Sequence, residues 1–78
     1  MDFELAGPIR RTSTLDAGRE GEQRARLRRA HGGRSWRKLS ALARVRLRDG
    51  STHKAVIHWY AAEGTGRYEM KLKFPLLD

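Results

Sequence analysis

Hydrophobic and polar residues alternate through most of the C-terminal half. Residues 39–48 and 67–74 alternate with a period of two, which is typical of strands with one buried face. Residues 52–61 lie between them and are rich in Val, Ile, Trp and Tyr, which also favours a strand. Turn residues separate the three segments, and Pro75 ends the last one. The pattern predicts a three-stranded antiparallel meander.

The first turn decides which side chains of this meander share a face. A two-residue Asp49-Gly50 turn would place Val45 opposite Lys54, whereas a three-residue loop with left-handed Gly50 places it opposite His53. The longer loop sets apolar residues against each other (Ala43 and Ala55, Ala41 and Ile57, Leu39 and Trp59), so we expect that register. In the second hairpin, a four-residue loop at 62–65 would pair Trp59 with Tyr68, Ile57 with Met70 and Ala55 with Leu72.

The N-terminal half has a weaker pattern. Residues 3–6 are a candidate fourth strand before Gly7-Pro8, and residues 10–13 are expected to be a loop. A helix is expected over residues 19–30, ended by Gly32-Gly33, although its only large apolar residues are Leu15 and Leu27. The fold class is therefore α+β: a single domain, residues 1–78, with one weak helix packed on the meander. Residues 1–34 form the strand, loop and helix, and residues 35–78 form the sheet.

The expected register divides the sheet into an apolar inner face and a charged outer face. The inner face would carry Leu39, Val45, Leu47, Ile57, Trp59, Tyr68, Met70, Leu72 and Phe74. The outer face would carry Arg44, Arg46, Lys54, His58, Tyr60, Arg67, Glu69, Lys71 and Lys73, with Leu42 and Val56. This face would carry six fixed positive charges and one negative charge, whereas an ordinary exposed sheet face mixes both signs. Because like charges on neighbouring strands repel, such an excess favours a surface that binds an anion. The alternative is an ordinary solvated sheet face.

Composition adds a strongly positive charge. Lys and Arg total 17 against 9 acidic residues, a net charge of +8, and 13 of the 17 are arginine. Arginine binds phosphate in a bidentate manner, so a polyanionic partner is favoured, either nucleic acid or an acidic protein. A GC-rich genome would also enrich arginine. The absence of cysteine excludes disulfides and thiolate catalysis. The acidic start and the lack of a long apolar run indicate a cytoplasmic protein without a membrane partner.

The residues expected to bind nucleic acid lie in two places, the arginine-rich helix and the outer sheet face. They are Arg24, Arg26, Arg28 and Arg29 from the helix, and Arg44, Arg46, Lys54, Tyr60, Arg67, Lys71 and Lys73 from the sheet. For the helix, a solvated charged surface is an equally good interpretation. Trp36, next to the sheet, is expected in the core, with a role as a stacking platform as the alternative.

A catalytic site is a second hypothesis. His58 would lie across from Glu69, and a carboxylate there could orient the ring for general acid–base cleavage of RNA. An ordinary cross-strand polar pair is the favoured interpretation. His53 and His58 point to opposite faces, so no metal site is expected, and no cofactor motif is present.

The ending His58-Trp59-Tyr60 followed by Gly64-x-Gly66-Arg67-x-Glu69-x-Lys71-x-Lys73 resembles short uncharacterised bacterial proteins without assigned function. The order of strand, helix and meander is also similar to the RelE/ParE toxin family in architecture and charge. Those toxins bind acidic antitoxins, and some cleave messenger RNA. The resemblance carries over no catalytic residue.

These observations lead to three functional hypotheses. A nucleic-acid-binding module, with RNA ahead of DNA, comes first; a toxin-type ribonuclease and an adaptor for an acidic protein are the alternatives. The helix offers little to cover the inner face, so a homodimer or an obligate partner is also expected.

Overall fold

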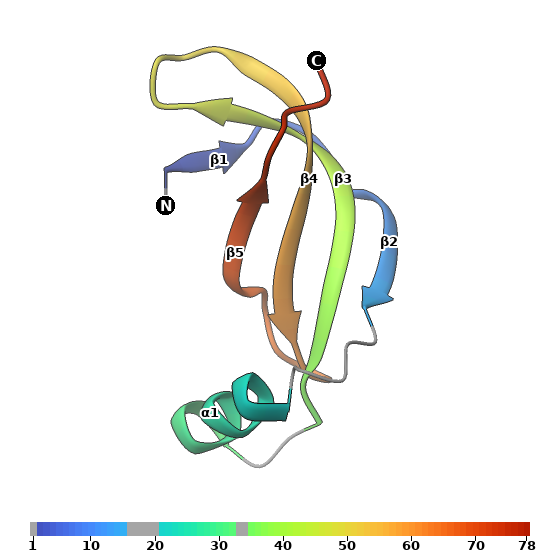
Figure 1. The fold of residues 1–78 in the computed structure, drawn as a ribbon, viewed down its shortest axis with the longest axis vertical. Coiled ribbons are helices and arrows are strands. Elements are labelled where there is room, and N and C mark those ends of the chain that lie inside the picture. The colour runs from blue at the N-terminus through green and yellow to red at the C-terminus, as the bar shows by residue number, and fades with distance from the viewer. Residues whose placement is uncertain (1, 16–20, 33–34) are drawn as a thin grey trace.

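A computed structural model describes residues 2–15, 21–32 and 35–78, with the backbone alone for residues 21–24. Its elements are β1 (Phe3–Leu5), β2 (Arg10–Leu15), α1 (Gly21–His31), β3 (Arg37–Leu47), β4 (Thr52–Ala61) and β5 (Tyr68–Lys73). The strands β3, β4 and β5 are antiparallel neighbours in one curled sheet, and α1 lies beyond one end of it (Figure 1). The fold is α+β, as expected, but the sheet has five strands rather than three or four.

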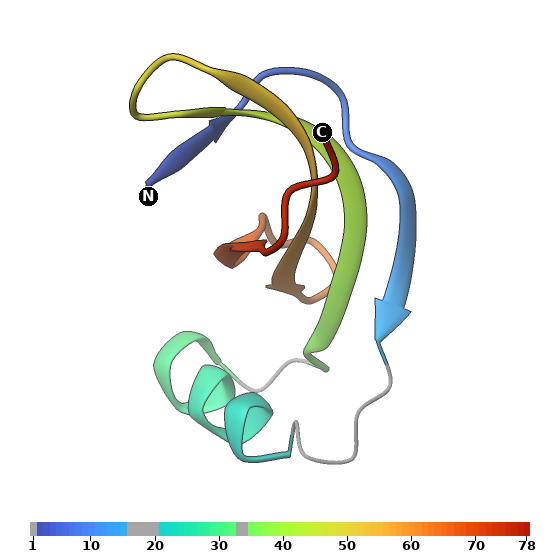
Figure 2. The same cartoon turned by 45° about the horizontal axis from the view of Figure 1, so that its top comes forward.

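The two additional strands share one edge of β3. β1 pairs with the end of β3 and confirms the strand expected near residues 3–6, whereas β2 pairs with its beginning. Both run antiparallel to β3, and the chain bends between them at Gly7-Pro8 (Figure 2). The expected loop at residues 10–13 is therefore wrong. Most β2 side chains are exposed, so the strand is held by backbone pairing and shows no apolar alternation.

The first hairpin has the expected register. Leu39 lies opposite Trp59, Ala41 opposite Ile57, Ala43 opposite Ala55 and Val45 opposite His53. Gly50 has φ 89°, and the Leu47 amide donates to the Ser51 carbonyl at 2.9 Å. A three-residue loop with a left-handed glycine therefore joins β3 and β4.

The second hairpin differs from the expected register. Ile57 lies opposite Leu72 instead of Met70, and Tyr60 lies opposite Tyr68, with an irregularity between these pairs. Glu69 has φ 54°, the left-handed conformation found at β-bulges. The extra residue reverses the faces of the residues before it. Tyr68 is consequently on the outer side, and the expectation that it belongs to the inner face is wrong.

Two hydrophobic clusters hold the fold together. The larger lies on the inner face and buries Phe3, Ala41, Ala43, Val45, Ala55, Ile57 and Trp59, with Met70, Leu72 and Leu76 packed against it. The smaller joins α1 to the sheet and consists of Leu27, Trp36, Tyr60 and Ala62, with Tyr68 at its margin. Trp36 is therefore a core residue, as expected. Phe74 is not, because it follows β5 and is 73% exposed.

Helix α1 begins at Gly21 and ends at His31, close to the expected range. Gly33, which was expected to help end the helix, lies outside the described residues, and Leu15 ends β2 instead of belonging to the helix. Gly32, at φ 113°, donates its amide to the Arg28 carbonyl at 2.8 Å. In the described part of the chain, no helix combines the length and the apolar character needed to cross a membrane.

Candidate nucleic-acid interface

Cations from neighbouring strands lie side by side on the outer face of the sheet. Residues paired across antiparallel strands share a face, and the register pairs Arg44 with Lys54. On the other side of β4, Val56 pairs with Lys73 and His58 with Lys71. We call the surface carrying Arg44, Arg46, Lys54, Lys71 and Lys73 the basic face. The bulge begins before Lys71, so these five residues keep the face expected from the sequence.

Two carboxylates contact the basic face through long ion pairs. Arg44 Nη2 lies 3.4 Å from Asp78 Oδ2, and Arg46 Nη1 lies 3.5 Å from Glu4 Oε1. All four side chains are about half exposed or more, and exposed pairs of this length hold their partners weakly. A stronger anion can therefore displace either carboxylate from its arginine.

The histidine and carboxylate suggested for catalysis are not directly opposite each other. His58 pairs with Lys71, because the bulge moves Glu69 out of that position. Both still line a small cavity of about 90 Å³, together with Lys38, Trp59, Tyr60, Lys71 and Lys73. His58 and Glu69 therefore line the same cavity, although they are not the cross-strand pair that the sequence predicted.

Glu69 is instead held by the helix. Arg26 donates to both of its carboxylate oxygens, from Nη1 to Oε2 at 2.8 Å and from Nη2 to Oε1 at 2.7 Å. This bidentate hydrogen bond lowers the pKa of Glu69, although partial burial opposes the shift. A carboxylate with a lowered pKa is a weak proton acceptor, which makes Glu69 poorly suited to orienting and activating His58.

Two further sheet residues are not available for the binding role expected from the sequence. Tyr60 is 7% exposed and packs under α1, so its ring is not available for stacking on a base. Arg67 lies over Trp59, with its guanidinium carbon 5.7 Å from the ring centroid. Trp59 is part of the inner-face cluster, so Arg67 does not join the basic face. Both corrections follow from the bulge and from the helix that covers this end of the sheet.

The helix arginines contribute unequally. Arg26 is engaged with Glu69, while Arg28 and Arg29 are exposed in the last turn. The side chain of Arg24 lies outside the described residues. Cations in the last turn complement the helix dipole, which gives Arg28 and Arg29 a structural role besides any binding role.

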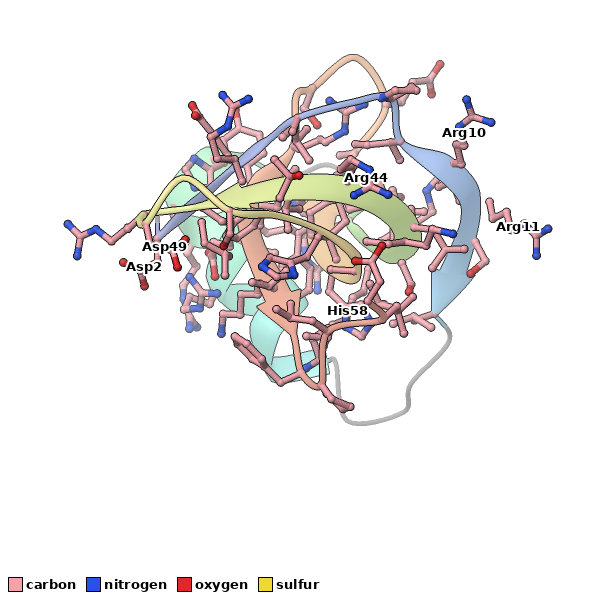
Figure 3. The ribbon with its side chains drawn as sticks, turned by 90° about the horizontal axis from the view of Figure 1, so that it is seen from above. Asp2, Arg10, Arg11, Arg44, Asp49 and His58 are labelled. Carbon is pink, nitrogen blue, oxygen red and sulfur yellow. The ribbon has the colours of Figure 1, made fainter. Side chains whose placement is uncertain are left out.

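Sequence reasoning missed three cations near this surface. Arg10 and Arg11 project outward from β2 (Figure 3), and they line one groove together with Arg44. Lys38 lies at the start of β3, with its Nζ 5.7 Å from the centroid of the Tyr60 ring. Thr12 and Thr14 are the only β-favouring signal in β2, and they were too few to indicate a strand.

Among the described residues, no group of three His, Asp or Glu side chains has a metal-binding arrangement. Comparison of the chain with protein-family models, curated proteins and solved structures gives no match.

Proposed function

We propose that this protein binds the phosphate backbone of nucleic acid with the basic face and the arginines of α1. RNA is the favoured nucleic acid and DNA is the alternative. The observation that carries the proposal is the set of five cations on adjacent strands of one sheet face. Alternate residues of a strand are roughly 6.6 Å apart. Arg44 with Arg46, and Lys71 with Lys73, therefore have a spacing comparable to that of successive phosphates in a nucleic-acid strand.

The aromatic rings near the basic face support contacts to phosphate rather than to bases. Tyr60 is buried, and the Tyr68 ring contacts the His31 ring at a centroid distance of 4.7 Å and a tilt of 38°. Sheet modules that read RNA sequence use exposed aromatic rings on the sheet face. We therefore expect weak sequence preference. RNA stands ahead of DNA because arginine-rich segments such as residues 24–29 are a common means of RNA recognition.

The test is a titration of labelled single-stranded RNA, duplex RNA and duplex DNA at several salt concentrations. We assume that each of the five cations neutralises one phosphate. A plot of the logarithm of the binding constant against the logarithm of the salt concentration should then have a slope of about −3.5 for single strands and about −4.5 for duplex DNA. A lack of binding even at low salt would exclude the proposal and leave the adaptor hypothesis.

Charge-reversal pairs locate the binding surface. R44E/R46E tests the basic face and R28E/R29E tests the helix. R37E/R48E is the matched control, because it changes the net charge by the same amount at other exposed arginines. We expect each test pair to weaken binding and to reduce the salt slope by about 1 for each phosphate that is no longer neutralised. Equal weakening by all three pairs would mean that only net charge matters and would overturn the placement.

The same samples test the ribonuclease alternative. RNA cleavage that disappears in His58→Ala would replace simple binding by catalysis as the function. The opposition of His58 and Lys71, with Glu69 held by Arg26, leads us to expect intact RNA throughout the titration.

A further inference from the structure

A groove borders the basic face where β2 approaches β3. It has a volume of about 650 Å³, and its lining includes four cations together with residues 6–8 and 42–43. We call it the arginine groove and define it by Arg10, Arg11, Arg44 and Lys54. Figure 3 shows Arg10 and Arg11 on β2, with Arg44 between that strand and the centre of the sheet.

The backbone of β2 is distorted so that two consecutive arginines line this groove. Successive side chains of a regular strand point to opposite faces. In β2 the register shifts between Arg10 and Ser13, and Arg11 has φ 53°. The left-handed conformation costs a residue other than glycine about 1 kcal/mol or more. Strain of this kind is concentrated at binding sites, where a bulge redirects a side chain.

The edge of the arginine groove already holds an anion from the chain itself. The Lys54 amide donates to Asp78 Oδ1, while Asp78 Oδ2 lies 3.4 Å from Arg44 Nη2. His53 Nδ1 lies 2.9 Å from the Asp78 backbone oxygen, and the Leu77 amide donates to the Lys54 carbonyl at 2.8 Å. The hydrogen bond from the Lys54 amide is the main cause of the lowered pKa of Asp78. Hydrogen bonds thus hold residues 77–78 along β4, and the Asp78 carboxylate lies next to Arg44 of the groove.

We propose that the arginine groove binds a phosphate group and that the Asp78 carboxylate is an internal competitor for Arg44. This inference rests on the proposed function and deepens it, because it names one phosphate subsite and the group that regulates it. A phosphate carries more acceptor oxygens than a carboxylate and can contact several guanidinium groups at once. Its arrival releases Asp78 from Arg44, so the affinity for the ligand is reduced by the strength of that ion pair.

The critical variant is Asp78→Asn, which removes the charge and retains an oxygen for the Lys54 amide. Asp2→Asn is its matched control, because Asp2 is an exposed aspartate that does not line the arginine groove. We expect Asp78→Asn to tighten RNA binding about two- to five-fold more than Asp2→Asn, which is the size of an exposed ion pair. Equal effects of the two variants, in a protein that binds RNA, would overturn the inference and leave the proposed function intact.

A second arm uses inorganic phosphate followed by NMR of the arginine side chains. We expect phosphate to shift the signals of Arg10, Arg11 and Arg44 before those of Arg48, and at lower concentrations in Asp78→Asn. Arg11→Gln should weaken this response, whereas Arg48→Gln should not. Phosphate shifts without RNA binding would support the groove and exclude nucleic acid as its ligand. Uniform shifts at all arginines would exclude the groove as a phosphate site.

Discussion

Among the described side chains of α1, Leu27 makes the main apolar contact with the sheet. Leu27 is fully buried, and it is the helix residue that enters the second cluster with Trp36, Tyr60 and Ala62. The other described connections are the exposed ion pair of Arg26 with Glu69 and the contact of the His31 ring with Tyr68. Replacing a buried leucine by alanine costs about 2–5 kcal/mol. This corresponds to a change of roughly 30-fold to several-thousand-fold in the docking equilibrium.

We therefore expect Leu27→Ala to release the helix without unfolding the sheet. An 11-residue helix is marginal on its own, so α1 should lose its helical structure when it is released. The inner-face cluster does not contain Leu27 and should remain intact. Ile57→Ala removes a fully buried residue of that cluster and should destabilise the whole domain by a similar amount.

NMR distinguishes local release from global unfolding. The indole N–H signals of Trp36 and Trp59 report on the second cluster and the inner-face cluster respectively. In Leu27→Ala, the Trp36 signal should move and the Trp59 signal should stay, with fast amide exchange confined to α1. Leu27→Met conserves volume and should leave both signals in place. Loss of both signals in a single transition would refute the reasoning, because the helix would then be integral to the core.

Two further predictions concern charge and assembly. The Arg26 hydrogen bonds lower the pKa of Glu69 below its usual 4.5, so the stability that the ion pair contributes should be complete at neutral pH and should disappear as the pH falls through the lowered pKa. The melting temperatures of wild type and Glu69→Gln should therefore converge in acid. A difference in melting temperature that stays the same at all pH values would contradict this. A groove of about 610 Å³ near the end of β5 is lined by Met70, Leu72 and Phe74, with Asp2, Asp49, Arg48 and Lys71 also in its lining. Because Phe74 in this groove is 73% exposed, we expect a second copy to cover it. Sedimentation at micromolar concentration should show a homodimer, and a monomer there would refute the prediction.

The sequence predicted those parts of the fold in which alternation and turn chemistry agree. In the first hairpin, Gly50 could supply the left-handed residue, and apolar residues faced each other in only one of the two loop lengths. Strand β2 could not be predicted in this way. Its residues bury little, so its conformation depends on the edge of β3, which is distant in sequence.

The candidate site was predicted in the same uneven manner. Arg44, Arg46 and Lys54 depend only on the first hairpin, and they lie on the expected face. Arg67 lies on the other face because of the bulge, and Tyr60 lies on the expected side but is buried under the helix. Arg10 and Arg11 were missed because their strand was missed. The predictions for the site were therefore wrong where contacts between residues distant in sequence determine the position of a side chain.

The bulge at Glu69 could not be predicted, because no glycine marks it. A glutamate at φ 54° bears a strain of about 1–2 kcal/mol, and its ion pair with Arg26 favours the conformation from outside the strand. Glu69→Gly and Glu69→Gln both remove the charge, but only the glycine relieves the backbone. We therefore expect Glu69→Gly to be more stable than Glu69→Gln, by up to about 1 kcal/mol in chemical denaturation after the greater chain entropy of glycine is counted. A clearly less stable glycine variant would mean that the backbone at position 69 is not strained, and that the ion pair alone sets the face on which Arg67 and Tyr68 lie.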